Sequence, residues 1–281
     1  MDTGIETMKV RTIITGATGS MGAAACEALA AKGVAVLMAC RNTRKAEAVR
    51  DGILSRCPSA DIEIRHLDLC SMASVREFAE SVVPGSVNAV FHNAGVISRK
   101  YELTVDGLEK TFSTNYFGPW LLTRLLIPKL PLDARIVSMI SLSCRYVKFD
   151  ERCLQPAEKD FSQLGTYARS KRALLSFSLE LARRNPGLRV NLADPGIVAS
   201  DMIDLGHWFD PLTDVIFKPF CKNPEKGVQP ALRALAASVP GPGYYVGKGA
   251  KEFQANILPP NWTQRYGPGQ KLYFRYRSRP C

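Results

Sequence analysis

Apolar, β-branched runs alternate with helical stretches along most of this chain, and no other feature limits its fold as strongly. The runs typical of strands are 10–14, 34–40, 62–67, 88–91, 135–140 and 188–192. Between them the sequence predicts helices at 23–31, 43–53, 71–83, 105–126 and 167–184. Parallel strands need crossover helices, which come to lie on the faces of the sheet. The alternation therefore predicts an α/β fold, a doubly wound parallel sheet with helices on both faces.

A glycine-rich turn at 15–22 joins the first predicted strand to the first helix. At this point of a parallel sheet, backbone N–H groups and the helix dipole bind phosphate groups. The glycines at 16, 19 and 22 depart from the G-x-G-x-x-G spacing, so a plain tight turn is the alternative. The turn favours a single-domain Rossmann-type fold over 1–260. Its candidate cofactor-binding residues are Gly16, Thr18, Gly19, Ser20, Met21 and Gly22.

Basic residues follow the second predicted strand, which ends at Cys40. In dinucleotide-binding sheets an acid at this point binds the ribose 2′-OH of NAD, whereas an arginine accommodates the 2′-phosphate of NADP. The residues at this point are Arg41 and Asn42, followed by Arg44 and Lys45, and no acid lies between 41 and 45. The pattern favours NADP(H) over NAD(H), with ordinary solvated helix charges as the alternative.

Tyr167 and Lys171 are four residues apart, which places a phenol and an ammonium on one face of a helix. A nearby positive charge favours the phenolate and lowers the tyrosine pKa, so that the hydroxyl can exchange a proton with an alcohol or ketone. This spacing is common by chance, so the surrounding motifs must decide whether the pair is catalytic.

The combined residues resemble the short-chain dehydrogenase/reductase family from position 10 to about 238. The resemblance rests on an ordered series of short motifs, whose order and spacing together are specific. The series is the 15–22 turn, Leu67-Asp68-Leu69, Asn93-Ala94-Gly95, Asn115, Ser141 at a strand end, Tyr167 with Lys171, and Pro195-Gly196 after a strand. Within the family, segments 38–42, 66–69 and 115–123 look most like the retinol dehydrogenase-like group.

This resemblance implies the roles of the site residues. Tyr167 is the catalytic acid/base, Lys171 lowers its pKa and holds the nicotinamide ribose, Ser141 positions the substrate oxygen, and Asn115 supports a water relay. Asp68 and Leu69 contact the adenine, although turn chemistry at a strand end is the alternative for Asp68 and Asn93. Asn93, Ala94 and Gly95 line the cofactor cleft, and Pro195, Gly196, Val198 and Ser200 border the nicotinamide.

Two details depart from the common family pattern. Position 20 is serine and the glycine has moved to 19, but Ser20 still offers a hydroxyl and an N–H to a pyrophosphate. The second is the choice of serine near the end of the fifth strand. Alternation places Ser141 and Ser143 on one face and Ser138 on the other. Alignment with the family's strand favours Ser141, with Ser143 as the fallback.

Pro119 falls inside the helix predicted at 105–126. Proline has no N–H, so the carbonyl of Asn115, four residues earlier, loses its helical donor. This leaves an acceptor for a water in a relay from Lys171 toward solvent. The alternative is a helix kink that fits Trp120 into the core.

The segment 200–220 is crowded with apolar side chains and is expected to form a lid over a lipophilic substrate; a plain contribution to the core is the alternative. The predicted function is the NADP(H)-dependent interconversion of a small lipophilic ketone or aldehyde and its alcohol. The alternatives are a catalytically silent cofactor-binding regulator or scaffold, and a membrane- or nucleic-acid-surface binder that uses a basic tail at 261–281.

Composition excludes several other classes. The 281 residues are 46% hydrophobic and 22% charged, which is ordinary for a globular domain. The three histidines lie far apart and the eight cysteines form no C-x-x-C pair, so we expect no metal site. No signal peptide or membrane span is evident, which favours a reduced, cytoplasmic protein.

The net charge of +11 is concentrated in two places. The tail at 261–281 holds five Lys and Arg with no acid, leaving +6 for the rest, and Arg41, Arg44 and Lys45 have the cofactor phosphate as a candidate partner. We therefore expect no nucleic-acid partner and favour a solvated tail. Peripheral membrane contact through the tail and homo-oligomer formation stay open.

Overall fold

The structure, a computed structural model, describes residues 10–147, 154–196, 223–238, 242–247 and 249–251. The strands among them are β1 (Arg11–Thr15), β2 (Ala35–Cys40), β3 (Ile62–His66), β4 (Val87–His92), β5 (Arg135–Met139), β6 (Arg189–Asp194), β7 (Gly243–Val246) and β8 (Gly249–Lys251). The α-helices are α1 (Ser20–Ala30), α2 (Thr43–Leu54), α3 (Met72–Ser81), α4 (Lys110–Phe112), α5 (Gly118–Leu126), α6 (Gln163–Arg184) and α8 (Pro224–Ala236). Shorter helical turns are η1 (Ser113–Phe117), η2 (Ile127–Lys129), η3 (Leu142–Arg145) and η5 (Glu158–Asp160).

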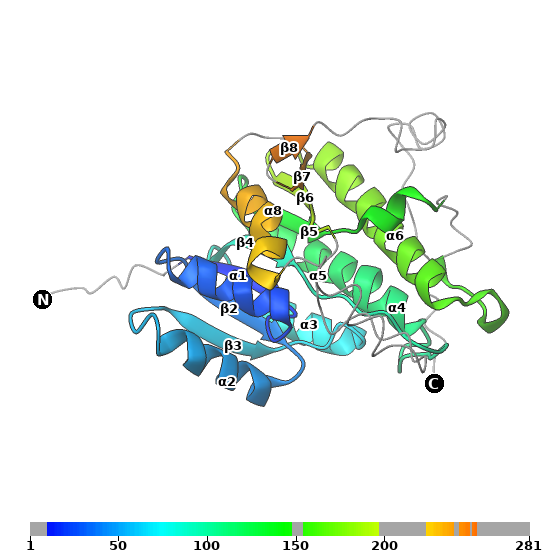
Figure 1. The fold of residues 1–281 in the computed structure, drawn as a ribbon, viewed down its shortest axis with the longest axis horizontal. Helices are drawn as coiled ribbons and strands as arrows, with labels where there is room; N and C mark the ends of the chain where they lie inside the picture. Colours follow the sequence, from blue (N-terminus) through cyan, green and yellow to red (C-terminus); the bar gives the residue numbers. More distant parts are fainter. Residues whose placement is uncertain (1–9, 148–153, 197–222, 239–241, 248, 252–281) are drawn as a thin grey trace, which may run out of the picture.

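The strands form one sheet in the order β3-β2-β1-β4-β5-β6-β7-β8 (Figure 1). All neighbours from β3 to β7 pair in parallel, and β8 pairs antiparallel with β7. The chain winds outward from β1 to β3 and then returns to β4 on the other side of β1. This reversal places the topological switch point at the carboxyl ends of β1 and β4, where sheets of this kind bind ligands. The predicted doubly wound Rossmann-type sheet is confirmed.

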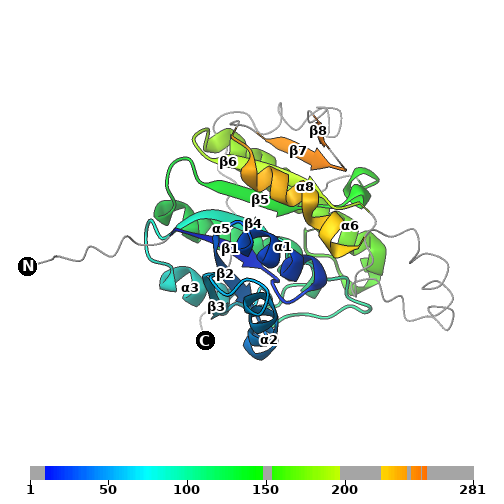
Figure 2. The same cartoon turned by 60° about the vertical axis from the view of Figure 1, so that its left-hand side comes forward.

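Helices cover both faces of the sheet because neighbouring strand residues point to opposite sides. Ile14, Met38 and Phe91 face one side and pack in a core with residues of α1 and α8. Ile13 and Leu37 face the other side and pack with residues of α3 and α5. Figure 2 shows α1 and α8 lying over the same face. Strand β2 is buried along its whole length, as its unbroken apolar run predicts.

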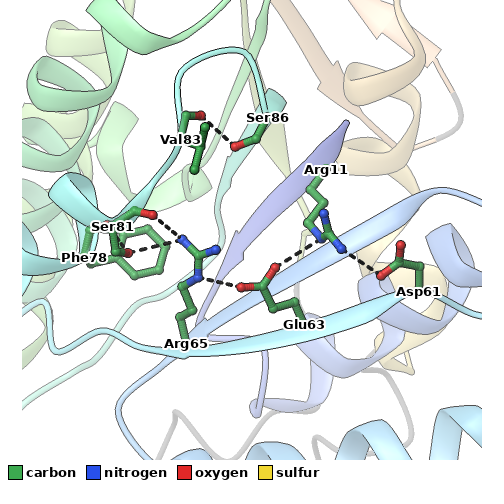
Figure 3. A network of polar contacts seen from close by, with 8 residues as sticks. All are labelled: Arg11, Asp61, Glu63, Arg65, Phe78, Ser81, Val83 and Ser86. Atoms are coloured by element: carbon green, nitrogen blue, oxygen red, sulfur yellow. Dashed lines mark hydrogen bonds and ion pairs between the residues drawn. The ribbon is translucent and has the colours of Figure 1, made fainter. Parts of the chain in front are cut away.

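The edge strand β3 carries charged side chains that are paired with one another (Figure 3). Arg11, at the start of β1, reaches across β2 to Asp61 at 3.0 Å and to Glu63 at 3.3 Å. Arg65 binds Glu63 at 2.6 Å and donates to the carbonyl oxygen of Ser81 at 2.8 Å. This network joins β1, β3 and the end of α3. Charges along an edge strand also disfavour its pairing with another chain.

The helix predicted over 105–126 is too long at its start. Leu103 pairs with Glu109 in an isolated bridge, and Gly107, between them, has a φ of 72°. The buried Glu109 carboxylate then accepts the N–H groups of Thr111 and Phe112 at 2.9 and 2.8 Å, and the helix begins there. The expected start at 105 was wrong because the bridge and the left-handed Gly107 keep the chain out of a helix until the Glu109 cap.

Other expectations fall on residues that the structure does not describe. The lid at 200–220, the basic tail at 261–281, Val198 and Ser200 lie outside the described residues. Elements α8, β7 and β8 have no counterpart among the predicted elements.

Within the described ranges, no helix is long and apolar enough to cross a membrane. In the same ranges, no group of three or more His, Cys, Asp and Glu side chains is placed to hold a metal ion.

Candidate active site

The glycine-rich turn between β1 and α1 is packed too tightly for side chains at two of its glycines. Gly16 has a φ of 64°, and a Cβ there would lie 2.9 Å from the Cα of Ala94. A Cβ on Gly22 would overlap the carbonyl oxygen of Gly16. Helix α1 has Gly19 at its N-cap without a side-chain cap, and no acid lies in its first turn. Its first N–H groups therefore suit an external anion such as a phosphate.

The loop after β4 is joined directly to this turn. The Thr15 hydroxyl accepts the N–H groups of Asn93 and Ala94, each at 3.1 Å. The Asn93 amide donates to the carbonyl oxygens of Thr15 at 3.0 Å and Gly16 at 3.2 Å. Its Oδ1 is buried and has no hydrogen-bond partner among the described residues. The Asn93 side chain therefore binds across to the turn, and it leaves one buried acceptor at the carboxyl end of the sheet.

The candidate adenine residues come after β3, and the candidate residues for the 2′-phosphate come after β2. Asp68 uses Oδ1 to accept the N–H of Cys70 at 2.9 Å, which is the turn chemistry expected of an aspartate at a strand end. Asn42 caps α2 by accepting the N–H of Lys45 at 2.9 Å. Arg41 is exposed. Burial chiefly raises the pKa of the Cys70 thiol, the charge of Asp68 also raises it, and the charge of Arg41 lowers it. Arg41 and Asp68 therefore occupy the same corner of the sheet.

Lys171 is buried beneath the loop after β4, with 2% of its surface exposed. Its ammonium donates to the carbonyl oxygen of Met139 at 2.9 Å. A Cβ on Gly95 would lie 3.2 Å from the Lys171 Nζ, so glycine leaves room for the ammonium. Among the described residues no carboxylate forms an ion pair with it, and burial lowers the pKa of Lys171 to about 8.

Asn115 lies in the π-helical turn η1, which directly precedes α5 and Pro119. Its amide donates to the carbonyl oxygen of Val96 at 3.0 Å and to the Ser170 hydroxyl at 2.9 Å, and its Oδ1 accepts the N–H of Val96 at 2.8 Å. Both amide protons are used. The side chain therefore fixes the loop after β4 against α6, and the predicted water relay would have to use the main-chain carbonyl of Asn115.

Tyr167 lies on α6 with Lys171, whose Nζ is 5.9 Å from the centroid of the phenol ring. The pKa of Tyr167 is raised to about 12, chiefly because its hydroxyl is buried, while a hydrogen bond with Ser141 acts in the opposite direction. Burial therefore dominates the pKa of Tyr167 in the protein itself, and the expected lowering of this pKa by Lys171 stays a prediction.

The three serines near the end of β5 have different surroundings. Ser138 is fully buried and its hydroxyl accepts from Ser178 at 2.9 Å. Ser141 comes after the strand and caps η3, and its hydroxyl accepts from the Ser143 hydroxyl at 3.0 Å. Ser141 is also hydrogen-bonded to Tyr167. Ser143 reaches this pair through its bond to Ser141.

Comparison with known proteins agrees with this arrangement. The chain matches the family described as short chain dehydrogenase over residues 11–205. Retinol dehydrogenase 13 of Homo sapiens is 32% identical over 238 residues, which are 80% of this chain and 71% of that protein. The chain belongs to the short-chain dehydrogenase family. Its relatives, which also include human retinol dehydrogenases 11 and 12, place it in the retinol dehydrogenase-like group of that family.

Solved structures share the fold of this short-chain dehydrogenase. A crystal structure of an uncharacterized protein from Mycobacterium Paratuberculosis is 30% identical, with a TM-score of 0.70 over 88% of this chain and 85% of that chain. A short-chain dehydrogenase from Sphingobium yanoikuyae in complex with NADPH is 18% identical, with a TM-score of 0.61 over 81% of this chain and 85% of that chain. As a family member, the protein is an oxidoreductase that acts on an alcohol or carbonyl group with an NAD(P)(H) cofactor.

The residues at the carboxyl ends of the strands fit such a dinucleotide. The first turn of α1 offers N–H groups to its phosphates, and the glycines at 16 and 22 let the backbone approach them. The unpaired Oδ1 of Asn93 needs a donor, and the Lys171 ammonium has two protons beyond the one that binds Met139. Donors and acceptors are therefore both available on this side of the sheet.

The structure also brings His92 and Asp194 to the site, which the motifs did not identify. His92 ends β4 with 1% of its surface exposed. Its Nε2 lies 2.7 Å from the Thr123 hydroxyl, which itself donates to the carbonyl oxygen of Pro119 at 2.8 Å. Nε2 is therefore the donor, and Nδ1 is an acceptor that has no hydrogen-bond partner within the described part of the chain. An acid just after the strand expected at 188–192 was the sequence signal for Asp194, whereas His92 carried none.

The buried His92 should make stability depend on pH. Burial, helped by the charge of Lys171, lowers the pKa of His92 from 6.5 to about 4. The unfolded chain therefore binds this proton first, and stability is lost as pH falls from 6.5 toward 4. Over that window the free energy of unfolding, measured with urea, should fall less steeply for His92→Gln than for the native protein. The difference in slope should be up to about 1 kcal/mol per pH unit.

The exposed His66→Gln is the control for this prediction, because it removes an imidazole from the surface. It should follow the native protein at each pH. Parallel curves for the native protein and His92→Gln would show that the buried imidazole does not cause the loss.

Proposed function

We propose that this protein interconverts a small lipophilic ketone or aldehyde and its alcohol with NADP(H), with Tyr167 as the acid/base. The observation that carries the proposal is the convergence of three groups at the end of β5. Ser141 is hydrogen-bonded to Tyr167. The Lys171 ammonium lies against Gly95 in the loop after β4 and 5.9 Å from the centroid of the phenol ring. A hydroxyl pair beside a buried cation is suited to binding a carbonyl oxygen and giving it a proton.

These positions support the following roles for the residues. When bound, the reduced nicotinamide supplies a hydride to the carbonyl carbon. Tyr167 carries its proton at neutral pH because its pKa is raised to about 12, so it can donate that proton to the carbonyl oxygen. Ser141 holds the same oxygen, and the Lys171 charge stabilises the phenolate that remains. Asn115 fixes the loop over Lys171 through its bonds to Val96.

The substrate class is supported by residues beyond the proton-transfer groups. The segment 200–220 is rich in large apolar side chains and follows Pro195 and Gly196, which we propose border the nicotinamide together with Val198 and Ser200. The retinol dehydrogenases among the relatives are named for a lipophilic alcohol. A lid of this composition would favour an apolar substrate.

Replacing Tyr167 with Phe tests the proton transfer. Turnover should fall by about 10²- to 10⁴-fold, because the substrate oxygen loses its proton donor, while NADPH affinity should change little. Turnover is measured by NADPH oxidation with a panel of lipophilic ketones and aldehydes, and affinity by fluorescence titration.

Tyr146→Phe, at a residue that is 82% exposed, removes a surface hydroxyl as the control and should keep native turnover. Full activity in Tyr167→Phe would sink the proposed mechanism. Native protein that binds NADPH yet oxidises it with no member of the panel would favour the silent regulator instead.

The preference for NADP(H) is proposed from the charges at the end of β2. Arg41 is exposed there and is followed by Arg44 and Lys45 in the first turn of α2, with no acid in that turn. The Asn42 side chain caps α2, so we propose Arg41, the residue directly after the strand, as the group that binds the cofactor. A guanidinium at this point suits the 2′-phosphate that distinguishes the two cofactors.

Arg41→Asp should move the preference toward NADH. The ratio of kcat/KM for NADPH over NADH should fall by about 10- to 100-fold, the worth of one charge-assisted hydrogen bond. The exposed Arg76→Asp, on α3, makes the same charge reversal elsewhere and should leave the ratio within about twofold. An unchanged ratio in Arg41→Asp would refute the assignment of Arg41.

A further inference from the structure

Asp194 is a buried carboxylate beside the site that none of the steps above uses. It ends β6 with 2% of its surface exposed. Its Oδ1 accepts the N–H of Gly196 at 2.8 Å, and its Oδ2 accepts the hydroxyl of Tyr244 at 2.9 Å. A buried carboxylate is costly unless its oxygens are hydrogen-bonded, so these bonds constrain both partners strongly.

The first bond holds the backbone after β6. Gly196 has a φ of 74°, and the aspartate two residues earlier closes the turn through the glycine N–H. This turn carries the Pro195-Gly196 pair at the carboxyl end of the strand next to β5. Its position relative to the end of β5 therefore depends on Asp194.

The second bond leads to the turn that carries Ser141. Tyr244 lies on β7, and the guanidinium of Arg145 stands 5.3 Å from the centroid of its ring. Arg145 is the last residue of η3, which Ser141 caps. The turn is closed by the bond from the Cys144 N–H to the Ser141 carbonyl oxygen at 3.0 Å. A chain of contacts thus runs from Asp194 through Tyr244 and Arg145 to Ser141.

We infer that Asp194 is a positioning residue for the reaction: it holds the Pro195-Gly196 turn directly and the Ser141 turn through Tyr244 and Arg145. The inference deepens the proposed function, on which it rests for the role of Tyr167. The Pro195-Gly196 turn and the Ser141 turn then keep their positions around the Tyr167 phenol during turnover. Asp194 itself touches neither substrate nor the transferred atoms.

The charge of Asp194 also acts on its neighbours. After burial and the Ser141 hydrogen bond, it is the next influence on Tyr167, and it raises that pKa; Cys144 raises it further. Burial is the main cause that raises the pKa of Tyr244 and of Cys144, and Asp194 raises both further. Arg145 acts in the opposite direction on both, as does Arg172 on Cys144. Among the described residues, the Lys171 ammonium is a further charged group near the phenol ring.

Two tyrosines on β7 supply a matched pair of variants. Tyr244→Phe removes the hydroxyl that binds Asp194, and Tyr245→Phe removes a hydroxyl from the opposite face of the same strand, where Tyr245 packs in the α1 and α8 core. In the full chain, Tyr244→Phe should speed amide hydrogen exchange at Cys144 and Tyr146, and Tyr245→Phe should not. With NADPH and substrate, Tyr244→Phe should lower kcat by about tenfold with little change in the KM for NADPH.

Asp194→Asn tests the charge while keeping hydrogen-bonding atoms in place. The limb of the kcat/KM profile that reports Tyr167 should move to lower pH by about half a unit or more, because a negative charge that raises its pKa is gone. Tyr244→Phe, which keeps the carboxylate, should not move this limb to lower pH. The exposed Asp133→Asn should leave the profile unchanged.

The inference is overturned if Tyr244→Phe matches Tyr245→Phe in both exchange and kcat, or if Asp194→Asn has the native pH profile. Should Asp194→Asn fail to fold, the Tyr244 and Tyr245 pair decides alone. Full turnover in Tyr167→Phe would remove the proposed function instead. The exchange experiment needs no turnover, so it would still test whether Asp194 holds the Ser141 turn.

Discussion

The site depends on one buried ammonium. Lys171 is enclosed without a carboxylate partner among the described residues, and a buried charge is costly unless its protons find acceptors. The Met139 carbonyl oxygen at the end of β5 takes one of them, which ties α6 to the sheet. Gly95 passes over the ammonium because it has no Cβ, and Asn115 holds that loop to α6 through Val96 and Ser170. The position of Tyr167, one helical turn away, follows from where Lys171 must sit.

Desolvation is the common cause of the shifted proton affinities around this ammonium. It raises the pKa of Tyr167 to about 12 and lowers those of Lys171 and His92 to about 8 and about 4. At neutral pH these shifts leave the phenol protonated and the imidazole neutral, with the ammonium able to lose its proton close to that pH. Groups with proton affinities spread in this way suit a site that must deliver a proton and take it back.

The sequence predicts the sheet well because parallel strands carry their signal locally, as the unbroken apolar run of β2 shows. The ordered motifs, through the resemblance that they carry, also predict that Ser141, Tyr167 and Lys171 share one site, and the structure brings these three residues together. The sequence fails where long-range contacts decide. Glu109 reads as a helix residue and is a buried cap, and Tyr244 comes from a strand that no pattern marked. The pKa of Tyr167 could not be predicted either, because burial is a property of the packed site.

The most direct test of the account is the fate of the transferred hydrogen. The protein is incubated with NADPH deuterated at both C4 positions of the nicotinamide and with lipophilic ketones and aldehydes, and the alcohols are analysed by mass spectrometry. The account predicts one deuterium on the carbinol carbon, retained in ordinary water. Alcohols without deuterium, or bound NADPH that yields no alcohol from any of these carbonyls, would contradict it.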